Sequence, residues 1–364
     1  MRSRHLTPAL LVALLLQFPA FVSRAQFYTE GTEPASVRWS SIRTPGYELI
    51  FPRGLDSLAQ TYANTLEWAR EAAGVGISFY PAHLERKRLP VVLHPYSAYS
   101  NGMSAWTPRY MSLYSCPQAY NPEPTPWAKH LVVHESRHSA QSQYVSSPKF
   151  AWTQWLTGDL IGGGLQTLYC GQSFFEGDAV WAETALTQGG RGRSADFFEY
   201  IRAAFAEGDV RDWWQWRYGS FGKYTPDYYK IGYLTMASMR TLYDPDFVNH
   251  YYERLLGSRW PFPVNVWGRT VRAASGMGFS DTWKAIADSL GAAEPAKIRA
   301  DGSFEQIESF CFVGDYVYAV RKGIRHAAQL VRIGPDGTTK VLRAFASSLT
   351  STVKSTPDGA VVWS

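Results

Sequence analysis

The chain has 364 residues, of which 45% are hydrophobic and 15% aromatic, so it is long enough to bury one large core or two smaller ones. The formal net charge of +5 includes three arginines among the first 25 residues, which leaves about +2 for the remainder. This charge balance argues against nucleic-acid binding, and we expect no nucleic-acid partner. The 14 tryptophans favour a large aromatic core over surfaces that stack on sugars.

The first 25 residues have the pattern of a signal peptide. Arg2 and Arg4 form a basic start, residues 10–16 form a short apolar stretch, and Ser23-Arg24-Ala25 supplies small residues at a cleavage site. The apolar stretch is too short to span a bilayer, and no later stretch reaches the length of a transmembrane helix. We therefore expect an exported protein that has no transmembrane segment after signal removal and is located in the periplasm, at the outer membrane or outside the cell.

Three cysteines occur, and an odd number in an oxidising compartment allows at most one disulfide. Their spacing does not fit a Cys-x-x-Cys metal site. We expect the thiols of Cys116, Cys170 and Cys311 to be small buried groups, and the sequence leaves open whether Cys116 and Cys170 pair.

The hydrophobic pattern predicts strands first and helices afterwards. Strands are expected at residues 47–51, 88–94 and 103–114, with a helix at 55–73 and a tight turn at Asn101-Gly102. Further helices are expected at 126–144, 150–169, 174–186, 195–207, 228–243, 246–256 and 280–290. This order predicts an α+β domain over residues 26–300.

Two local features refine the expected helices. Thr125 is a suitable cap for the helix that begins at Pro126, because proline is favoured in the first turn. Gly162-Gly163-Gly164 weakens the next helix and favours close helix packing, with a ligand cradle as the alternative.

The sequence pattern changes near residue 300, and residues 301–364 are predicted to form short strands. Strands are expected at 310–321, 329–333, 340–345 and 360–363, and Pro-Asp-Gly turns begin at Pro335 and Pro357. Over about 60 residues this pattern resembles TolB-like β-propeller repeats of secreted bacterial proteins. The sequence ends before a propeller could close, so we expect a partial all-β propeller-like segment and a fragment of a longer protein.

The motif His134-Glu135-Ser136-Arg137-His138 lies in a predicted helix. Because residues four apart share one helix face, His134 and His138 can bind one metal ion, while Glu135 reaches a water molecule without being a ligand. A surface helix with two ordinary histidines is the alternative. A catalytic zinc site takes three protein ligands and keeps one open position, so a third ligand is expected elsewhere in the chain.

Glu176 is the candidate for the third ligand. It begins the segment Glu-Gly-Asp-Ala-Val-Trp-Ala-Glu, and together with His-Glu-x-x-His this segment resembles the gluzincin metallopeptidases, the clan of thermolysin and aminopeptidase N. The resemblance implies one Zn²⁺ ion bound by His134, His138 and Glu176, and Glu135 as the general base. The form of the second motif is closest to aminopeptidase N, and its distance from His138 fits the broader group of secreted bacterial gluzincin-like proteins.

Two more residues belong to this resemblance. Glu183 lies two helical turns after Glu176 and would orient a ligand imidazole, with a solvated surface position as the equal alternative. Tyr229, in a Tyr-x-x-Gly sequence, would donate a hydrogen bond to the developing oxyanion, with core packing as the alternative. The sequence alone does not choose Tyr229 from the neighbouring tyrosines at 224, 228 and 233.

The segment at residues 101–106 departs from the aminopeptidase N pattern. Aminopeptidases of that type carry a glutamate there, whereas no acidic residue occurs from Ser97 to Gln118, and Arg109 is the only charge. A bare edge strand can still pair with an extended peptide, which favours endopeptidase action or another acyl substrate.

We therefore expect an exported zinc-dependent peptidase that acts on a peptide or protein substrate, followed by a segment that could bind an envelope partner. The alternative is a catalytically silent envelope protein that binds glycan or protein through its propeller and aromatic surface. The enzyme is favoured because a structural zinc site has four protein ligands and does not need Glu135.

Overall fold

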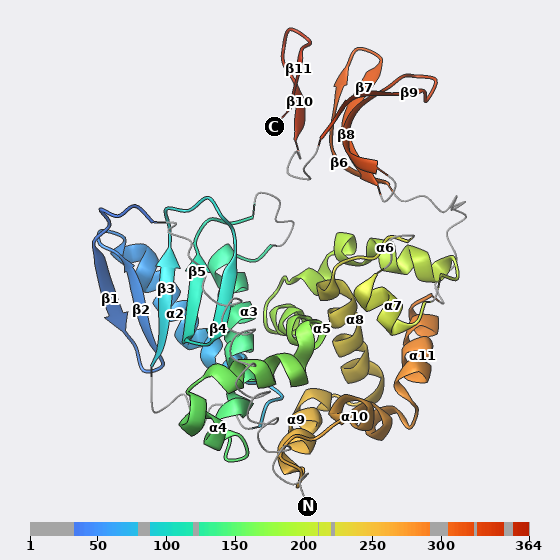
Figure 1. The fold of residues 1–364 in the computed structure, drawn as a ribbon. Coiled ribbons are helices and arrows are strands. Elements are labelled where there is room, and N and C mark those ends of the chain that lie inside the picture. Colours follow the sequence, from blue (N-terminus) through green and yellow to red (C-terminus); the bar gives the residue numbers. More distant parts are fainter. Residues whose placement is uncertain are drawn as a thin grey trace, which may run out of the picture. The chain divides into compact units, whose positions relative to one another are not determined.

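The computed structural model describes residues 33–78, 88–118, 124–209, 211–219, 223–291, 305–323, 326–345 and 352–363 (Figure 1). The expected signal peptide at residues 1–25 lies outside these ranges. The described residues form two compact units: unit 1 runs up to Arg202 and includes Asp227–Leu290, and unit 2 contains Ala203–Pro226 and the residues after Leu290. The chain combines helices and sheets and is of the α+β class, as predicted.

Unit 1 contains a five-stranded mixed sheet in the order β1-β2-β3-β5-β4. Its strands are β1 (Trp39–Arg43), β2 (Tyr47–Pro52), β3 (Leu89–His94), β4 (Gly102–Trp106) and β5 (Arg109–Tyr114). The central pairs β2–β3 and β3–β5 are parallel, and the outer pairs are antiparallel. β4 is therefore an edge strand of this sheet.

The expected strand at 103–114 is wrong, because two strands occupy this segment. Pro108 lies in the turn between β4 and β5, and proline interrupts a ladder because it has no N–H to donate. The expected turn at Asn101-Gly102 is also wrong: Gly102 begins β4, and its N–H donates to the Asn101 side chain. β1 was not predicted, because its short polar sequence lies at the other edge and is largely exposed.

The helices are α2 (Asp56–Ala72), α3 (Trp127–Ser142), α4 (Ala151–Thr157), α5 (Leu160–Leu186), α6 (Ala195–Ala206), α7 (Trp213–Tyr218), α8 (Tyr228–Ser238), α9 (Phe247–Gly257), α10 (Val266–Ser275) and α11 (Phe279–Gly291). Short 3₁₀ segments follow at Gln143–Ser146 and Arg191–Arg193, and a π-helical turn at Met239–Tyr243 extends α8. Neither α7 nor α10 was predicted. None of the described helices combines the length and the apolar character needed to cross a bilayer.

Glycines move two predicted helix boundaries. Gly158 has φ 60° and separates α4 from α5, so the expected continuous helix at 150–169 is wrong. Gly171 has φ 55° and kinks α5, which otherwise continues through the expected gap before residue 174. The glycine run does pack closely at Gly162, but against a side chain of the sheet: a Cβ there would lie 2.7 Å from Nε1 of Trp106 on β4.

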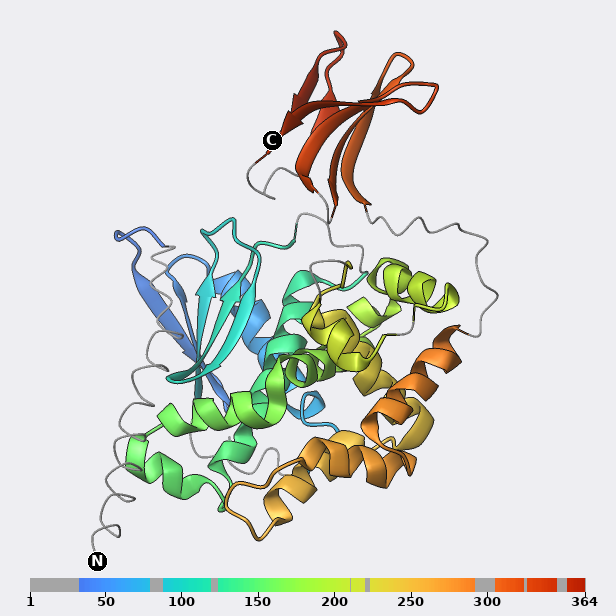
Figure 2. The ribbon, with the colours of Figure 1, turned by 45° about the vertical axis from the view of Figure 1, so that its right-hand side comes forward.

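α3 is the central helix of unit 1. It packs against α2 and β4 on the side of the sheet and against α5 on the other side (Figures 1 and 2). Every residue from His130 to Ser142 is buried, including the histidines, Glu135 and Arg137. Thr125 does not cap this helix, because Pro126 occupies the N-cap position and no side chain bonds the first turn. A helix buried on all faces holds its polar side chains in fixed positions only if each finds a partner.

The best-partnered of these buried groups is Arg137. Its guanidinium donates two hydrogen bonds to Asp178 on α5, at 2.7 and 3.2 Å, and both side chains are fully buried. Arg240 lies 2.8 Å from the same carboxylate, and Gln141 donates to it at 2.7 Å. Burial alone would raise the pKa of Asp178, but Arg137 and Arg240 outweigh it and hold this pKa below its ordinary value. The cluster joins α3, α5 and the end of α8.

Replacement of Asp178 by Asn should destabilise the protein by about 3–5 kcal/mol, because two buried arginines lose their counter-charge. Because the folded pKa of Asp178 is lowered, its stabilisation is present above the ordinary aspartate pKa of 3.8 and is lost as the pH falls through the folded pKa. Urea unfolding at pH 7 measures the difference. Asp288→Asn on the exposed side of α11 is the control and should change stability by less than about 0.5 kcal/mol. Equal stability of both variants would contradict a role for the cluster.

The strands of unit 2 are β6 (Glu305–Val313), β7 (Tyr316–Gly323), β8 (His326–Ile333), β9 (Thr339–Ala344), β10 (Val353–Ser355) and β11 (Val361–Trp363). β6 to β9 form an antiparallel meander in sequence order, and β10 pairs with β11. The expected single strand at 310–321 is wrong, because a turn at Gly314, with φ 56°, divides it into β6 and β7. The two Pro-Asp-Gly sequences lie in the β8–β9 and β10–β11 turns, as predicted.

All three cysteines are free thiols, so the Cys116–Cys170 bridge considered above does not form in this structure. Cys170 is buried, with its Sγ 3.5 Å from the Tyr252 hydroxyl. Burial raises the pKa of this thiol to about 12, so it is packed as a small apolar group.

Candidate metal centre

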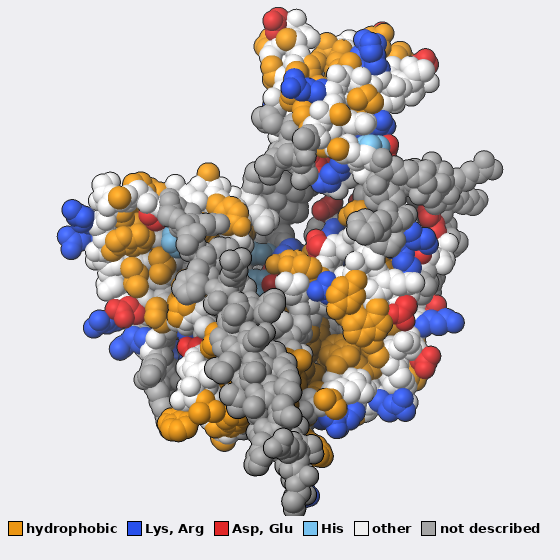
Figure 3. Space-filling view, in the orientation of Figure 1, with side chains coloured by type: hydrophobic (Ala, Val, Ile, Leu, Met, Phe, Trp, Pro, Cys, Tyr) orange, Lys and Arg blue, Asp and Glu red, His pale blue; other side chains and the backbone are white. Residues whose placement is uncertain are grey.

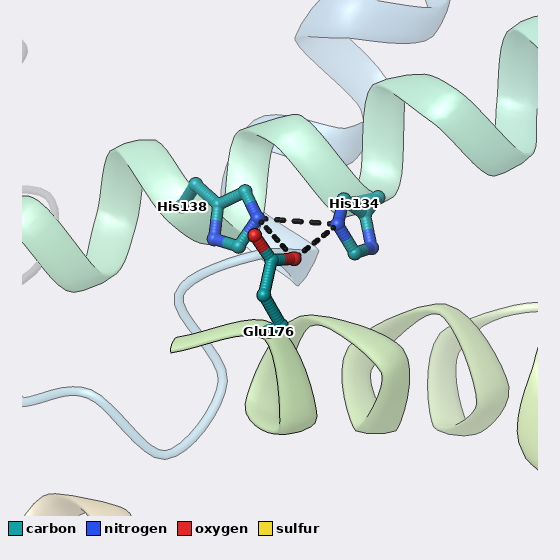
Figure 4. A group of neighbouring side chains, drawn as sticks. All are labelled: His134, His138 and Glu176. Atoms are coloured by element: carbon teal, nitrogen blue, oxygen red, sulfur yellow. Dashed lines mark hydrogen bonds and ion pairs between the residues drawn. The ribbon is translucent and has the colours of Figure 1, made fainter. Parts of the chain in front are cut away.

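His134, His138 and Glu176 converge, as Figure 4 shows. The two histidines lie one turn apart on α3, and Glu176 faces them from α5. The Nε2 atoms of the histidines are 3.1 Å apart, and each is 3.1 Å from Oε2 of Glu176. The three side chains can therefore hold a single metal ion.

The donor atoms match the size and chemistry of a zinc site. Two ligands at about 2.1 Å from zinc and at tetrahedral angles are about 3.4 Å apart, within a few tenths of an ångström of the observed separations. Two imidazoles and one carboxylate form a common ligand set of catalytic zinc. No fourth His, Cys, Asp or Glu joins the group within the described ranges.

Each histidine also has a partner for its second ring nitrogen. Nδ1 of His134 is 3.1 Å from Glu183 Oε2, and Nδ1 of His138 is 3.0 Å from Gln141 Oε1. Such partners fix the tautomer, so that Nε2 of each ring is left for the metal. Glu183 is fully buried and is therefore not the solvated surface residue that was its alternative.

Glu183 is held in turn by Arg191. The guanidinium donates to both carboxylate oxygens at 2.7 and 3.1 Å, and the Arg191 backbone N–H donates to Oε1 at 3.1 Å. His130, one turn before His134 on α3, lies 3.4 Å from the same carboxylate. Burial alone would raise the pKa of Glu183, but Arg191 and His130 outweigh it and lower that pKa, so the residue stays ionised.

The neighbouring carboxylates of Glu176 and Glu183 change the pKa of His134. Burial alone would lower its pKa, but hydrogen bonds to Glu176 and Glu183 outweigh it and raise the pKa to about 9. The raised pKa favours the protonated imidazole. Binding a cation through Nε2 would release this proton, so metal binding would strengthen as the pH rises toward 9.

The three side chains lie in a cleft of about 480 Å³ in unit 1. Glu135 lines this cleft, and its Oε2 is buried with no hydrogen-bond partner among the described residues. Burial raises the pKa of Glu135, which makes its carboxylate a stronger proton acceptor. In Figure 3 histidine atoms, in pale blue, are visible in the hollow between the sheet and the helices of unit 1.

The edge strand β4 forms one wall of the cleft. Residues 101–104 line it, and Gly102 lies so close to α3 that a Cβ there would be 2.6 Å from Glu135 Oε1. Arg109, the only charged residue of this region, lines a separate cavity, where its guanidinium is 5.1 Å from the centre of the Trp106 ring.

Tyr229 lines the cleft, whereas the tyrosines at 224, 228 and 233 are not part of its lining. Its ring centre is 6.3 Å from that of His134, and the guanidinium of Arg191 lies 4.9 Å from it. Burial, followed by the nearby Glu176, raises the pKa of the phenol, which therefore keeps its proton and can donate it in a hydrogen bond. Tyr233 instead packs against Phe198.

Two glycines bring Tyr229 and Glu176 together. A Cβ on Gly177 would lie 2.1 Å from the carbonyl carbon of Gly232, and a Cβ on Gly232 would lie 2.1 Å from Ser173 O. α5 and α8 therefore cross backbone to backbone, one residue after Glu176 and three residues after Tyr229.

Sequence reasoning missed His130, Gln141 and Arg191. His130 continues the four-residue spacing of the two metal-site histidines, and Gln141 follows His138 by three residues, so both carried a helical signal. Arg191 follows a Gly-Gly break and begins a 3₁₀ turn, and no local pattern connects it to the metal helix.

No protein-family model matches the sequence, and no curated protein is significantly similar to it. The chemistry of the site is therefore inferred from its own residues.

Replacement of Gly177 by Ala should destabilise the protein by about 1–3 kcal/mol or more, because the new methyl group overlaps the backbone of α8. Gly164→Ala on the same helix is the matched control: a Cβ there meets nothing within 4 Å, and about 0.5–1 kcal/mol of stabilisation is expected. Urea unfolding of both variants gives the comparison. If Gly177→Ala is as stable as the parent, the close crossing of α5 and α8 is not required.

Proposed function

We propose that the protein is an exported zinc-dependent peptidase of the gluzincin type. The observation that carries the proposal is the combination, in one cleft, of a three-residue metal group with a buried carboxylate, Glu135, whose Oε2 has no hydrogen-bond partner among the described residues. A purely structural zinc site would have a fourth protein ligand and no reason to place Glu135 beside it. The apolar stretch near the start of the sequence supports export.

In this mechanism each side chain has one task. His134, His138 and Glu176 would hold the zinc ion, which when bound polarises the substrate carbonyl and makes water acidic enough to react at neutral pH. Glu135 would take the proton from the attacking water and pass it to the leaving amine. Tyr229 would donate a hydrogen bond to the carbonyl oxygen as negative charge develops on it.

The cleft favours an extended peptide bound at its middle. The unpaired side of β4 offers backbone N–H and C=O groups along the wall of the cleft, and a substrate strand can pair with them irrespective of its side chains. An aminopeptidase needs an acidic group for the substrate amine, but β4 carries none. Besides Glu135 and Glu176, the described lining has one carboxylate, Asp227, which already caps α8 through the N–H groups of Tyr229 and Lys230. We therefore propose endopeptidase activity.

Unit 2 would act in partner binding. The four-stranded meander of β6 to β9 has the strand order of a propeller blade, and the β10–β11 hairpin would begin the next blade. We take this as support for a partial β-propeller that binds a component of the cell envelope.

Glu135→Gln should abolish hydrolysis and leave zinc binding intact, because the amide cannot accept a proton but none of the three ligands is altered. Hydrolysis is measured on a mixed peptide library by mass spectrometry, and zinc by elemental analysis of the same sample. Glu199→Gln, on the exposed side of α6, is the control and should cleave like the parent. Cleavage by the Glu135 variant at the parental rate would exclude this residue as the base, and the positions of the cuts distinguish endo- from exopeptidase action.

Tyr229→Phe should lower kcat by about 10²- to 10³-fold with little change in KM, because the hydroxyl acts on charge that develops only in the transition state. Tyr228→Phe is the matched control, since its ring stacks on Tyr229 but does not line the cleft. Steady-state kinetics on a peptide identified in the library measures both. A rise in KM at constant kcat would instead assign Tyr229 to substrate binding.

A further inference from the structure

Unit 1 carries a cluster of exposed apolar side chains away from the metal cleft. Three belong to α4, and three belong to the loop between α9 and α10. Trp155 is 86% exposed, Val264 is 80% exposed and Trp260 is 76% exposed, although a side chain of this size is normally covered. We call the group the tryptophan patch, and it consists of Trp152, Trp155, Leu156, Trp260, Phe262 and Val264.

The two segments lie side by side (Figures 1 and 2). The rings of Trp152 and Phe262 meet edge to face with 6.2 Å between their centres. Lys149, just before α4, donates to the backbone carbonyl of Ser258 in the loop. Arg269 of α10 holds the tip of the loop by donating to the Val264 carbonyl at 2.8 Å. The two segments are thus joined by an aromatic contact, and hydrogen bonds hold the loop in place.

The charges within the two segments that carry the patch are all positive. Residues 147–158 and 257–270 contain Lys149, Arg259 and Arg269 and no carboxylate. The next carboxylate along the chain, Asp159, lines a separate cavity together with Arg109. A cationic rim around an apolar centre is complementary to a surface that is anionic outside and apolar beneath.

The shape and composition favour a lipid surface over other partners. The side chains with the greatest exposure protrude, whereas protein partners are usually anchored by residues that fill pockets. Sugar-binding aromatic surfaces need polar side chains that hydrogen-bond hydroxyl groups, and Leu156 and Val264 offer none. Tryptophan is enriched where a bilayer meets water, because its ring is apolar and its N–H is polar.

We propose that the tryptophan patch docks unit 1 on the surface of a bilayer that contains anionic phospholipids. The indole rings enter the headgroup region, and the guanidinium of Arg259 faces the phosphates. The protein lies on the membrane and does not cross it. This inference does not rest on the metal site, because the patch and the cleft share no residue.

The test is co-sedimentation of the protein with vesicles at 0.15 M salt. The protein is purified from the extracytoplasmic fraction of cells that express the full chain, and the vesicles are phosphatidylcholine alone or with one third phosphatidylglycerol. We expect binding to the anionic vesicles and a fall in affinity of at least tenfold for Trp155→Ser/Trp260→Ser. Trp39→Ser/Trp68→Ser, two exposed tryptophans on β1 and α2, is the matched control and should bind like the parent.

A second pair of variants tests the charges. Arg259→Ala should weaken binding to anionic vesicles about fivefold, since each basic residue at such a surface contributes about that factor. Arg38→Ala, an exposed arginine before β1, should have no effect. Equal binding of parent and Trp155→Ser/Trp260→Ser would overturn the proposal. So would a dimer in sedimentation velocity without lipid that this variant dissociates, because the patch would then belong to a contact with a second copy. Peptidase activity on a soluble peptide should be the same in all four variants.

Discussion

The buried ion pair between Arg137 and Asp178 is the interaction on which the arrangement of the site depends. It joins α3 to α5 one residue before His138 and two residues after Glu176. Because both groups are removed from water, neither helix can slide along the other without leaving a charge unpaired, and that displacement is costly. The metal-site side chains, which repel or attract one another according to their protonation, are therefore held at fixed distances by a contact that takes no part in the chemistry.

Two paths of hydrogen bonds lead outward from the metal group and hold its histidines in place. His134 leads to Glu183 and then to Arg191, and His138 leads to Gln141 and then to Asp178. The second path ends in the ion pair that joins the helices. Asp178 therefore both supports the metal group and stabilises the fold. The first path ends at Arg191, which also lies against the ring of Tyr229.

The parts of the site that follow local spacing could be predicted from the sequence. His134 and His138 are one helical turn apart, and the spacing alone places their rings together. Glu176 and Tyr229 were chosen by resemblance, and the structure brings both to the cleft because Gly177 and Gly232 let their helices touch. That contact joins two glycines 55 residues apart in sequence, and no periodicity of the sequence encodes it.

The fold, like the site, was predicted correctly where local sequence patterns determine it. The α+β class followed from strands that precede helices, and β2, β3 and α2 have nearly the predicted bounds. Errors arose where one residue changes the direction of the chain: Pro108 between β4 and β5, Gly158 before α5, and Gly314 between β6 and β7. The hydrophobic pattern continues across these positions, so only backbone geometry reveals the break.

Gly102 has a consequence for what the cleft can admit. With no side chain between this residue and Glu135, the unpaired edge of β4 stands directly beside the carboxylate, and a chain laid along that edge presents its backbone to the reacting groups. Such a strand edge binds a segment only if that segment offers its backbone N–H and C=O groups in an extended conformation. Under the proposed activity, proline-rich segments and segments locked in stable helices would be spared, while unfolded chains in the envelope would be degraded, so the folding state of a protein rather than its sequence would decide its lifetime.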